Sequence, residues 1–88
     1  MENLTNYRKK IDLIDGKIVT LLAKRLQFSA KIGKFKKKHD LKIKDIRREK
    51  AMIRQRIAYA KTKCIPARFT RTLFQCIFRQ SRHIQKLD

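Results

Sequence analysis

The chain has 88 residues, with 25 lysines and arginines against seven aspartates and glutamates, and a formal net charge of +18 at pH 7. This length suits one domain, residues 1–88, with a core so modest that association with another chain would help it. One proline, two glycines and no alternating β-branched run favour an all-α fold. No signal-peptide pattern and no run of about 18 apolar residues is present, so we expect a cytoplasmic protein without a membrane partner.

The excess of positive charge suggests attraction to polyanions. The basic residues are spread over the whole chain, however, and no RNP-like motif, zinc-finger spacing or recognition helix accompanies them. A general bias toward lysine gives the same composition, so specific nucleic-acid binding is the lesser alternative. Cys64 and Cys76 form no metal-binding spacing with His39 and His83, and we predict thiols and no metal site.

The first predicted helix spans about residues 3–39 and opens at Asn3, whose side chain can cap free backbone amides. At 1.5 Å per residue it is roughly 50 Å long, whereas a compact monomer of this size is only about 30 Å across. Much of its apolar seam would therefore lie uncovered, which predicts a partner helix. The seam recurs every three or four positions and consists of Leu4, Tyr7, Ile11, Ile14, Ile18, Leu21, Phe28, Ile32 and Phe35.

Arg25 interrupts this seam, and burying a guanidinium in an apolar stripe costs free energy unless a negatively charged group pairs with it. Lys36 lies three turns later, turned by about 20°, and so shares a face with Arg25. Arg8 is about 25 Å before Arg25 along the axis and turned by about 100°. One straight helix cannot bring Arg8 and Arg25 to one small ligand, but an antiparallel partner helix can. Gly33, in the same helix, indicates either a close backbone approach or neutral drift.

A short connection at residues 40–44 leads to a second predicted helix, about residues 45–63, and Pro66 fits the first turn of a third, about residues 66–86. Asp45 stands where a helix cap belongs. The apolar residues of the second helix are Ile46, Met52, Ile53, Ile57 and Ala60. The buried side of the third is predicted to carry Phe69, Leu73, Phe74, Ile77, Phe78 and Ile84.

The polar residues of the last two helices are unusually placed. Asp45 and Glu49 are the only acids between residues 41 and 87. They share one helix face beside Arg48, where either helix capping or a functional role explains them. Ser81 and Gln85 continue the stripe of Phe74 and Phe78 at helical spacing, which predicts a lined cavity. The chain thus offers cations and neutral polar groups for a small polyanion, without a catalytic triad or glycine-rich phosphate loop.

Several runs in order resemble the all-helical class of chorismate mutases over nearly the whole chain. They are Tyr7-Arg8-Lys9-Lys10-Ile11-Asp12, Ile14-Asp15, Leu21-Leu22-Ala23-Lys24-Arg25, Ile32-Gly33-Lys34-Phe35-Lys36, Asp45-Ile46-Arg47-Arg48-Glu49-Lys50 and Leu73-Phe74-Gln75, followed by Ser81 and Gln85. The resemblance implies an intertwined three-helix homodimer with active sites shared between chains. It also implies an isomerase that converts chorismate to prephenate in phenylalanine and tyrosine biosynthesis, without a cofactor.

The same resemblance implies a role for each matching position. Arg25 and Arg8 of the partner subunit would grip the substrate's carboxylates, and Lys36 and Gln85 would face the ether oxygen of the breaking bond. Glu49 would accept a hydrogen bond from the ring hydroxyl of the substrate. The residues expected to complete the pocket are Asp45, Arg48 and Ser81.

The chain departs from the family pattern in its excess of basic residues, such as Arg68, Arg79 and Arg82, which we expect on the surface. Isochorismate pyruvate lyases share the fold and are the nearest alternative. Glu49 favours the mutase, because the hydroxyl it would contact sits elsewhere on isochorismate. A basic helical dimer that binds nucleic acid would instead lose affinity steeply with salt and would not depend on Gln85.

Overall fold

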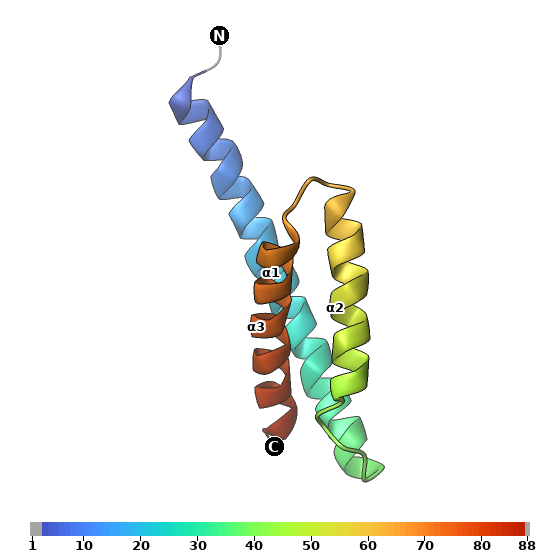
Figure 1. Cartoon of the computed structure of the whole chain (residues 1–88). Coiled ribbons are helices and arrows are strands. Elements are labelled where there is room, and N and C mark those ends of the chain that lie inside the picture. Colours follow the sequence, from blue (N-terminus) through green and yellow to red (C-terminus); the bar gives the residue numbers. More distant parts are fainter. Residues whose placement is uncertain (1–2, 88) are drawn as a thin grey trace.

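The computed structural model describes residues 3–87, and these form three helices and no strand. Helix α1 spans Leu4–Lys38, α2 spans Ile46–Lys61 and α3 spans Ala67–Lys86. Figure 1 shows the N-terminal half of α1 standing clear of the other two helices, and the chain measures 59 × 26 × 15 Å along its principal axes. The prediction of an all-α fold with one long and two shorter helices is confirmed. None of the helices described has the length and apolar character needed to cross a bilayer.

Local sequence signals account for where the helices begin and end. Asn3 and Asp45 cap α1 and α2, their side chains accepting hydrogen bonds from the backbone N–H groups of Asn6 at 2.9 Å and Arg48 at 3.0 Å. Both helices end in the same left-handed turn, at Asp40 (φ 55°) after α1 and Cys64 (φ 60°) after α2. In each case the following amide reaches back to the last turn of the helix, which satisfies carbonyls that would otherwise lack a partner.

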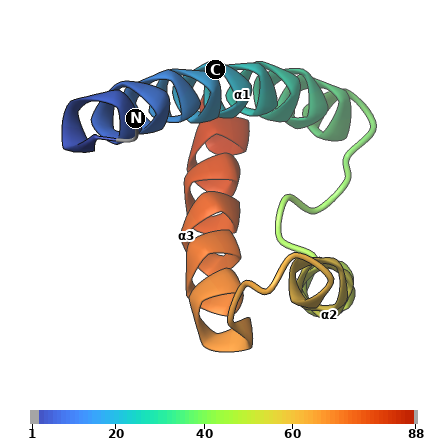
Figure 2. The same ribbon diagram turned by 90° about the horizontal axis from the view of Figure 1, so that it is seen from above.

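Helix α3 packs against both α1 and α2 and forms the small core. Its C-terminal end meets α1, while its N-terminal end lies away from α1 (Figure 2). Among residues 3–87 the buried apolar side chains are Ile53, Ala60 and Phe78. Phe69 and Leu73 were predicted on the buried side of the third helix, and this is wrong within the single chain, where they are 59% and 43% exposed. They lie in the half of α3 that does not reach α1.

The seam of α1 is uncovered along its whole length. All nine of its residues are exposed in the single chain, from 44% for Tyr7 to 62% for Leu21 and Phe28. An apolar strip of this extent, interrupted at Arg25, is unusual on a monomeric protein and is typical of an interaction surface.

Gly33 lies where α1 and α3 cross, which decides between the two explanations of this residue in favour of close backbone approach. A Cβ at Gly33 would come within 2.6 Å of both the Cα and the carbonyl oxygen of Gln85. A Cβ at Gly16, in the clear part of α1, would meet nothing within 4 Å. The crossing therefore requires glycine at position 33 only.

This contrast gives a matched pair of stability predictions. Gly33→Ala should destabilise the protein by about 1–3 kcal/mol, because the helices must separate to admit the methyl group. Gly16→Ala should stabilise it by roughly 0.5–1 kcal/mol, because alanine is the better helix former and nothing opposes it. Denaturant unfolding of the two variants and the wild type measures both effects. A Gly33→Ala protein at least as stable as Gly16→Ala would contradict the observed crossing.

Candidate active site

A cavity of about 400 Å³ lies among the three helices, a size suited to a small molecule. It is lined by residues of α1, the connection before α2, α2 as far as Arg56, and the C-terminal half of α3. Seven of the eight residues predicted to bind a ligand line this cavity: Arg25, Lys36, Asp45, Arg48, Glu49, Ser81 and Gln85. The structure thus gathers in one place polar groups that are up to 60 residues apart in the sequence.

Arg8 is the predicted residue that does not line the cavity. It lies on the exposed N-terminal half of α1, seventeen residues before Arg25. This position agrees with the helical geometry, which does not allow one chain to bring both arginines to the same ligand.

Gln85 provides a buried amide at the floor of the site. The residue is 8% exposed, and its backbone is pressed against Gly33 of α1. Its side-chain Oε1 is buried without a hydrogen-bond partner among the described residues. Most buried polar atoms in proteins are paired, and an amide oxygen is an acceptor, so a hydrogen-bond donor of a ligand would complete this position. The NH2 group of the same amide is the part of Gln85 that can donate.

Arg25 is half-buried and no carboxylate within residues 3–87 forms an ion pair with it. Its guanidinium carbon lies 5.4 Å from the ring centroid of Phe78. Burial lowers the pKa of Arg25 from its ordinary value, and the positive charge of Arg56 lowers it further. Both effects penalise the charged form of the side chain, and an anion bound beside it would relieve them.

Arg56 is a lining residue that the sequence reasoning missed. Its guanidinium carbon lies 6.0 Å from the ring centroid of Phe74, so two cations stand over neighbouring aromatic rings of α3. The signal was present in the sequence, because Arg56 follows Glu49 by seven residues and so shares its helix face.

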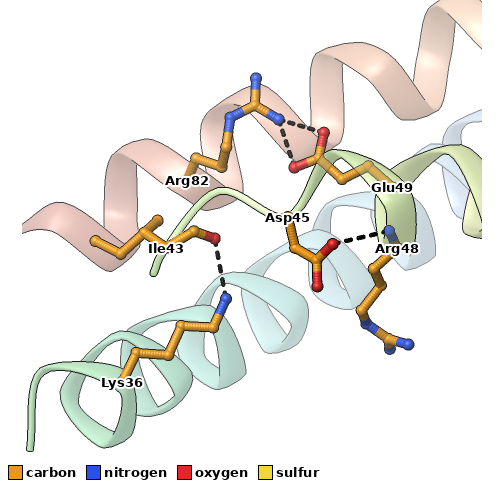
Figure 3. Close-up of polar contacts among 6 residues, drawn as sticks. All are labelled: Lys36, Ile43, Asp45, Arg48, Glu49 and Arg82. Atoms are coloured by element: carbon orange, nitrogen blue, oxygen red, sulfur yellow. Dashed lines mark hydrogen bonds and ion pairs between the residues drawn. The ribbon is translucent and has the colours of Figure 1, made fainter. Parts of the chain in front are cut away.

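Lys36 and Asp45 are held by local contacts at the edge of the cavity (Figure 3). The Nζ of Lys36 donates to the backbone oxygen of Ile43 at 2.9 Å. Asp45 accepts from the backbone N–H of Arg48 and so serves as a helix cap while also lining the cavity. An ammonium has three donors, so Lys36 keeps hydrogen-bonding capacity for a ligand.

Ser81 pairs with Ser29, a second residue that the sequence reasoning missed. Their hydroxyl groups form a buried hydrogen bond that joins α3 to α1. Ser29 also donates to the backbone oxygen of Arg25 at 3.0 Å. A hydroxyl has one proton to donate, so Ser81 donates to Ser29 and presents only acceptor lone pairs elsewhere. Ser29 is four residues after Arg25, a spacing that places them on the same face.

Arg82 lines the cavity, contrary to the expectation from the sequence. It was predicted as a basic surface residue, like Arg68 and Arg79, which are exposed. Instead its Nη1 donates to both carboxylate oxygens of Glu49, at 2.5 and 2.6 Å (Figure 3). The side chains of Arg82 and Glu49 are only 22% and 21% exposed. Arg82 follows Phe78 by four residues, which turns it toward the cavity rather than into solvent.

The chemistry of the site is that of an anion receptor with neutral hydrogen-bonding groups. In the part of the chain that the structure describes, no three histidine, cysteine or acidic side chains lie close enough to hold a metal ion. The cavity combines cations from α1 and α2 with a buried amide and one neutralised carboxylate. Such a site suits a compact substrate that carries negative charge.

Comparison with known proteins adds an independent line of evidence. Residues 7–86 match the protein family described as chorismate mutase type II. The chain is 37% identical over 84 residues to a bifunctional chorismate mutase/prephenate dehydratase of Buchnera aphidicola, which covers 96% of this chain and 22% of that protein. It is 35% identical over 81 residues to the T-protein of Haemophilus influenzae, which covers 92% of this chain and 22% of that protein. The chain thus spans about a fifth of the length of these relatives.

A solved structure is also similar. A conserved hypothetical protein from Pyrococcus furiosus superimposes with a TM-score of 0.76 at 36% sequence identity, covering 94% of this chain and 95% of that one. The similarity therefore extends over the arrangement of all three helices.

Proposed function

The chain belongs to the chorismate mutase type II family, and we propose that it converts chorismate to prephenate in the cytoplasm, within phenylalanine and tyrosine biosynthesis. One observation carries the proposal most strongly. The amide of Gln85, whose NH2 group can donate a hydrogen bond, lines the same cavity as the ammonium of Lys36 and the guanidinium of Arg25, which forms no ion pair among residues 3–87. These are the groups that a dicarboxylate with a breaking ether bond requires.

The proposed reaction explains why the site needs no nucleophile. A [3,3] rearrangement is intramolecular: the ether C–O bond breaks while a C–C bond forms in the same molecule. The protein has to hold a compact, chair-like conformer and to stabilise negative charge on the ether oxygen in the transition state. Neither task calls for a general base or a cofactor.

Arg25 suits the first task, because a guanidinium can clamp a carboxylate with two parallel hydrogen bonds. Lys36 and Gln85 suit the second, since each can donate to the ether oxygen as it becomes negative. Preorganised donors of this kind act at the developing charge without reorganising during the reaction. Glu49 would accept a hydrogen bond from the ring hydroxyl, and Asp45, Arg48 and Ser81 would complete the pocket.

We place the second carboxylate contact on Arg8 of the partner subunit. The exposed seam of α1 supports this assignment. Two copies of the chain can bury their seams against each other, so a homodimer needs no other kind of partner. In an antiparallel pair, the N-terminal half of one α1 would run past the C-terminal half of the other. That arrangement would bring Arg8 of the partner subunit toward the cavity that contains Arg25.

The seam makes dimerisation a direct prediction. Sedimentation equilibrium at micromolar protein should give about twice the chain mass of 10.6 kDa, because so little apolar surface is buried within one chain. Replacing Ile11 and Ile18 of the seam by lysine should dissociate the dimer and abolish activity. A folded, active monomer would contradict the proposed shared site.

Substrate selectivity separates this function from isochorismate pyruvate lyase, which the same fold can support. We expect loss of chorismate with formation of prephenate, and little or no pyruvate from isochorismate. Glu49→Ala should lose far more activity than the exposed control Arg79→Ala. Efficient pyruvate release from isochorismate by the wild type would assign the chain to the lyase instead.

A further inference from the structure

The ion pair between Arg82 and Glu49 has no role in the function proposed so far. We infer that Arg82 is a positioning residue of the site: it fixes the Glu49 carboxylate for the ring hydroxyl of the substrate and offsets its negative charge. This inference rests on the proposed function, because it concerns the substrate contact assigned to Glu49. It adds a residue that was expected to lie on the surface.

The geometry of the pair favours orientation over simple charge pairing. One nitrogen, Nη1 of Arg82, lies within 2.6 Å of both oxygens of Glu49. The contact joins α3 to α2, so it ties the carboxylate to a second helix. Glu49 can otherwise rotate about its own side-chain bonds. Both side chains are mostly buried, where a charge-assisted contact is stronger and less screened than on the surface.

The pair leaves Glu49 free to act on a ligand. An ionised carboxylate has about four acceptor positions, and a single nitrogen placed between the two oxygens leaves some of them open. Glu49 lines the cavity, so an open acceptor position is available to a hydroxyl donor there. Arg82 thereby selects the side of the carboxylate that faces the ligand.

Charge gives the second reason. The proposed substrate carries two carboxylates, while Glu49 and Asp45 place two more at the same cavity. Like charges gathered in one partly buried site oppose binding. Within residues 3–87, the Glu49 carboxylate forms an ion pair with Arg82. Glu49 can then accept a hydrogen bond from the hydroxyl without repelling the carboxylates of the substrate.

The ring hydroxyl sits on the carbon next to the breaking C–O bond but undergoes no bond change itself, so its contact with Glu49 is present in the bound substrate and in the transition state alike. Removing Arg82 should therefore raise KM more than it lowers kcat. Arg82→Ala should raise KM about 10- to 100-fold, the range expected for losing a charge-assisted contact. A merely structural role would instead lower the melting temperature and the active fraction, leaving KM unchanged.

A double-mutant cycle tests whether Arg82 acts through Glu49. Steady-state kinetics with chorismate should be measured for Arg82→Ala, Glu49→Gln, the double variant and the exposed control Arg79→Ala. We expect Arg82→Ala to change KM less than about threefold in the Glu49→Gln background, because the carboxylate it positions is gone. Arg82→Lys should recover part of the loss, since one nitrogen makes both contacts, and Arg82→Gln should recover less. Arg79→Ala should match the wild type.

Each other result has a distinct meaning. Equal effects of Arg82→Ala in the two backgrounds would show that Arg82 contacts the substrate directly or acts elsewhere, and would overturn the inference. So would an unchanged KM in Arg82→Ala, or in Arg82→Gln if the alanine variant fails to fold. A wild type that does not convert chorismate would overturn the proposed function, and this inference would fall with it.

Discussion

Gln85→Glu is expected to be nearly inactive at neutral pH and to recover activity on acidification. The glutamine amide is neutral at every accessible pH and can always donate to the ether oxygen. A glutamate can donate only when it is protonated. Its ionised form would instead set negative charge against an oxygen that is itself becoming negative.

The direction of this pH dependence follows from the surroundings of residue 85. Its burial would raise the pKa of an introduced carboxyl above the ordinary value of about 4.3, whereas the charges of Lys36 and Arg25 would lower it. In either case the active, protonated form gains as the pH falls, so the rate should rise from pH 7.5 toward pH 5. At pH 7.5 the loss in kcat should be about 10²- to 10³-fold, as for removal of one oxyanion donor.

The measurement is a pH profile of kcat for Gln85→Glu, the wild type and Gln80→Glu. Gln80 lies on the same helix and is exposed, so its variant carries the same chemical change outside the cavity. The wild type and Gln80→Glu should vary little between about pH 5 and 8, because the Gln85 amide that they retain is neutral throughout this range. Equal activity of Gln85→Glu at pH 7.5 and pH 5 would remove Gln85 from the breaking bond.

Arg8→Ala and Arg25→Ala should each be poor catalysts as homodimers and should restore activity when they are mixed. Each arginine would contribute two charge-assisted hydrogen bonds of roughly 1.5–3 kcal/mol, so each loss should cost about 10²- to 10⁴-fold in kcat/KM. Each site would take Arg25 from one chain and Arg8 from the other. A heterodimer then contains one site with both arginines and one with neither.

Unfolding and refolding the two variants together tests this sharing. Random pairing makes half of the dimers mixed, so about a quarter of all sites should regain wild-type activity. Arg8→Ala mixed with wild type provides the reference for subunit exchange. Activity that stays at the level of the separate variants, despite heterodimers demonstrated by mass spectrometry, would show that Arg8 acts within its own chain or not at all.

Much of the fold follows from spacing alone. The three- and four-residue recurrence of the α1 seam predicted a helix too long for its own chain to cover, and every seam residue is exposed. Asn3 and Asp45 cap helices as their side chains suggest. The cavity residues were found in the same way, because Ser81 and Gln85 continue an apolar stripe and Arg25 breaks one.

What spacing does not determine is how the helices cross. Ser29, Arg56 and Arg82 became site residues only once α1, α2 and α3 were placed against one another, and each lay on a face that spacing had already marked. Phe69 is exposed in the single chain for the same reason, because periodicity identifies an apolar face without saying how far a neighbouring helix of that chain reaches along it. Gly33 shows the limit clearly: the sequence allowed either drift or close approach, and only the position of Gln85 decides.

The proposed reaction rearranges chorismate without adding or removing any atom. A time course of chorismate with purified protein, followed by proton NMR, tests it directly. We expect loss of chorismate matched by an equal amount of prephenate, with no pyruvate, at a rate that Gln85→Ala reduces by about 10²-fold or more. Chorismate that disappears no faster than in buffer alone, or a product other than prephenate, would contradict it.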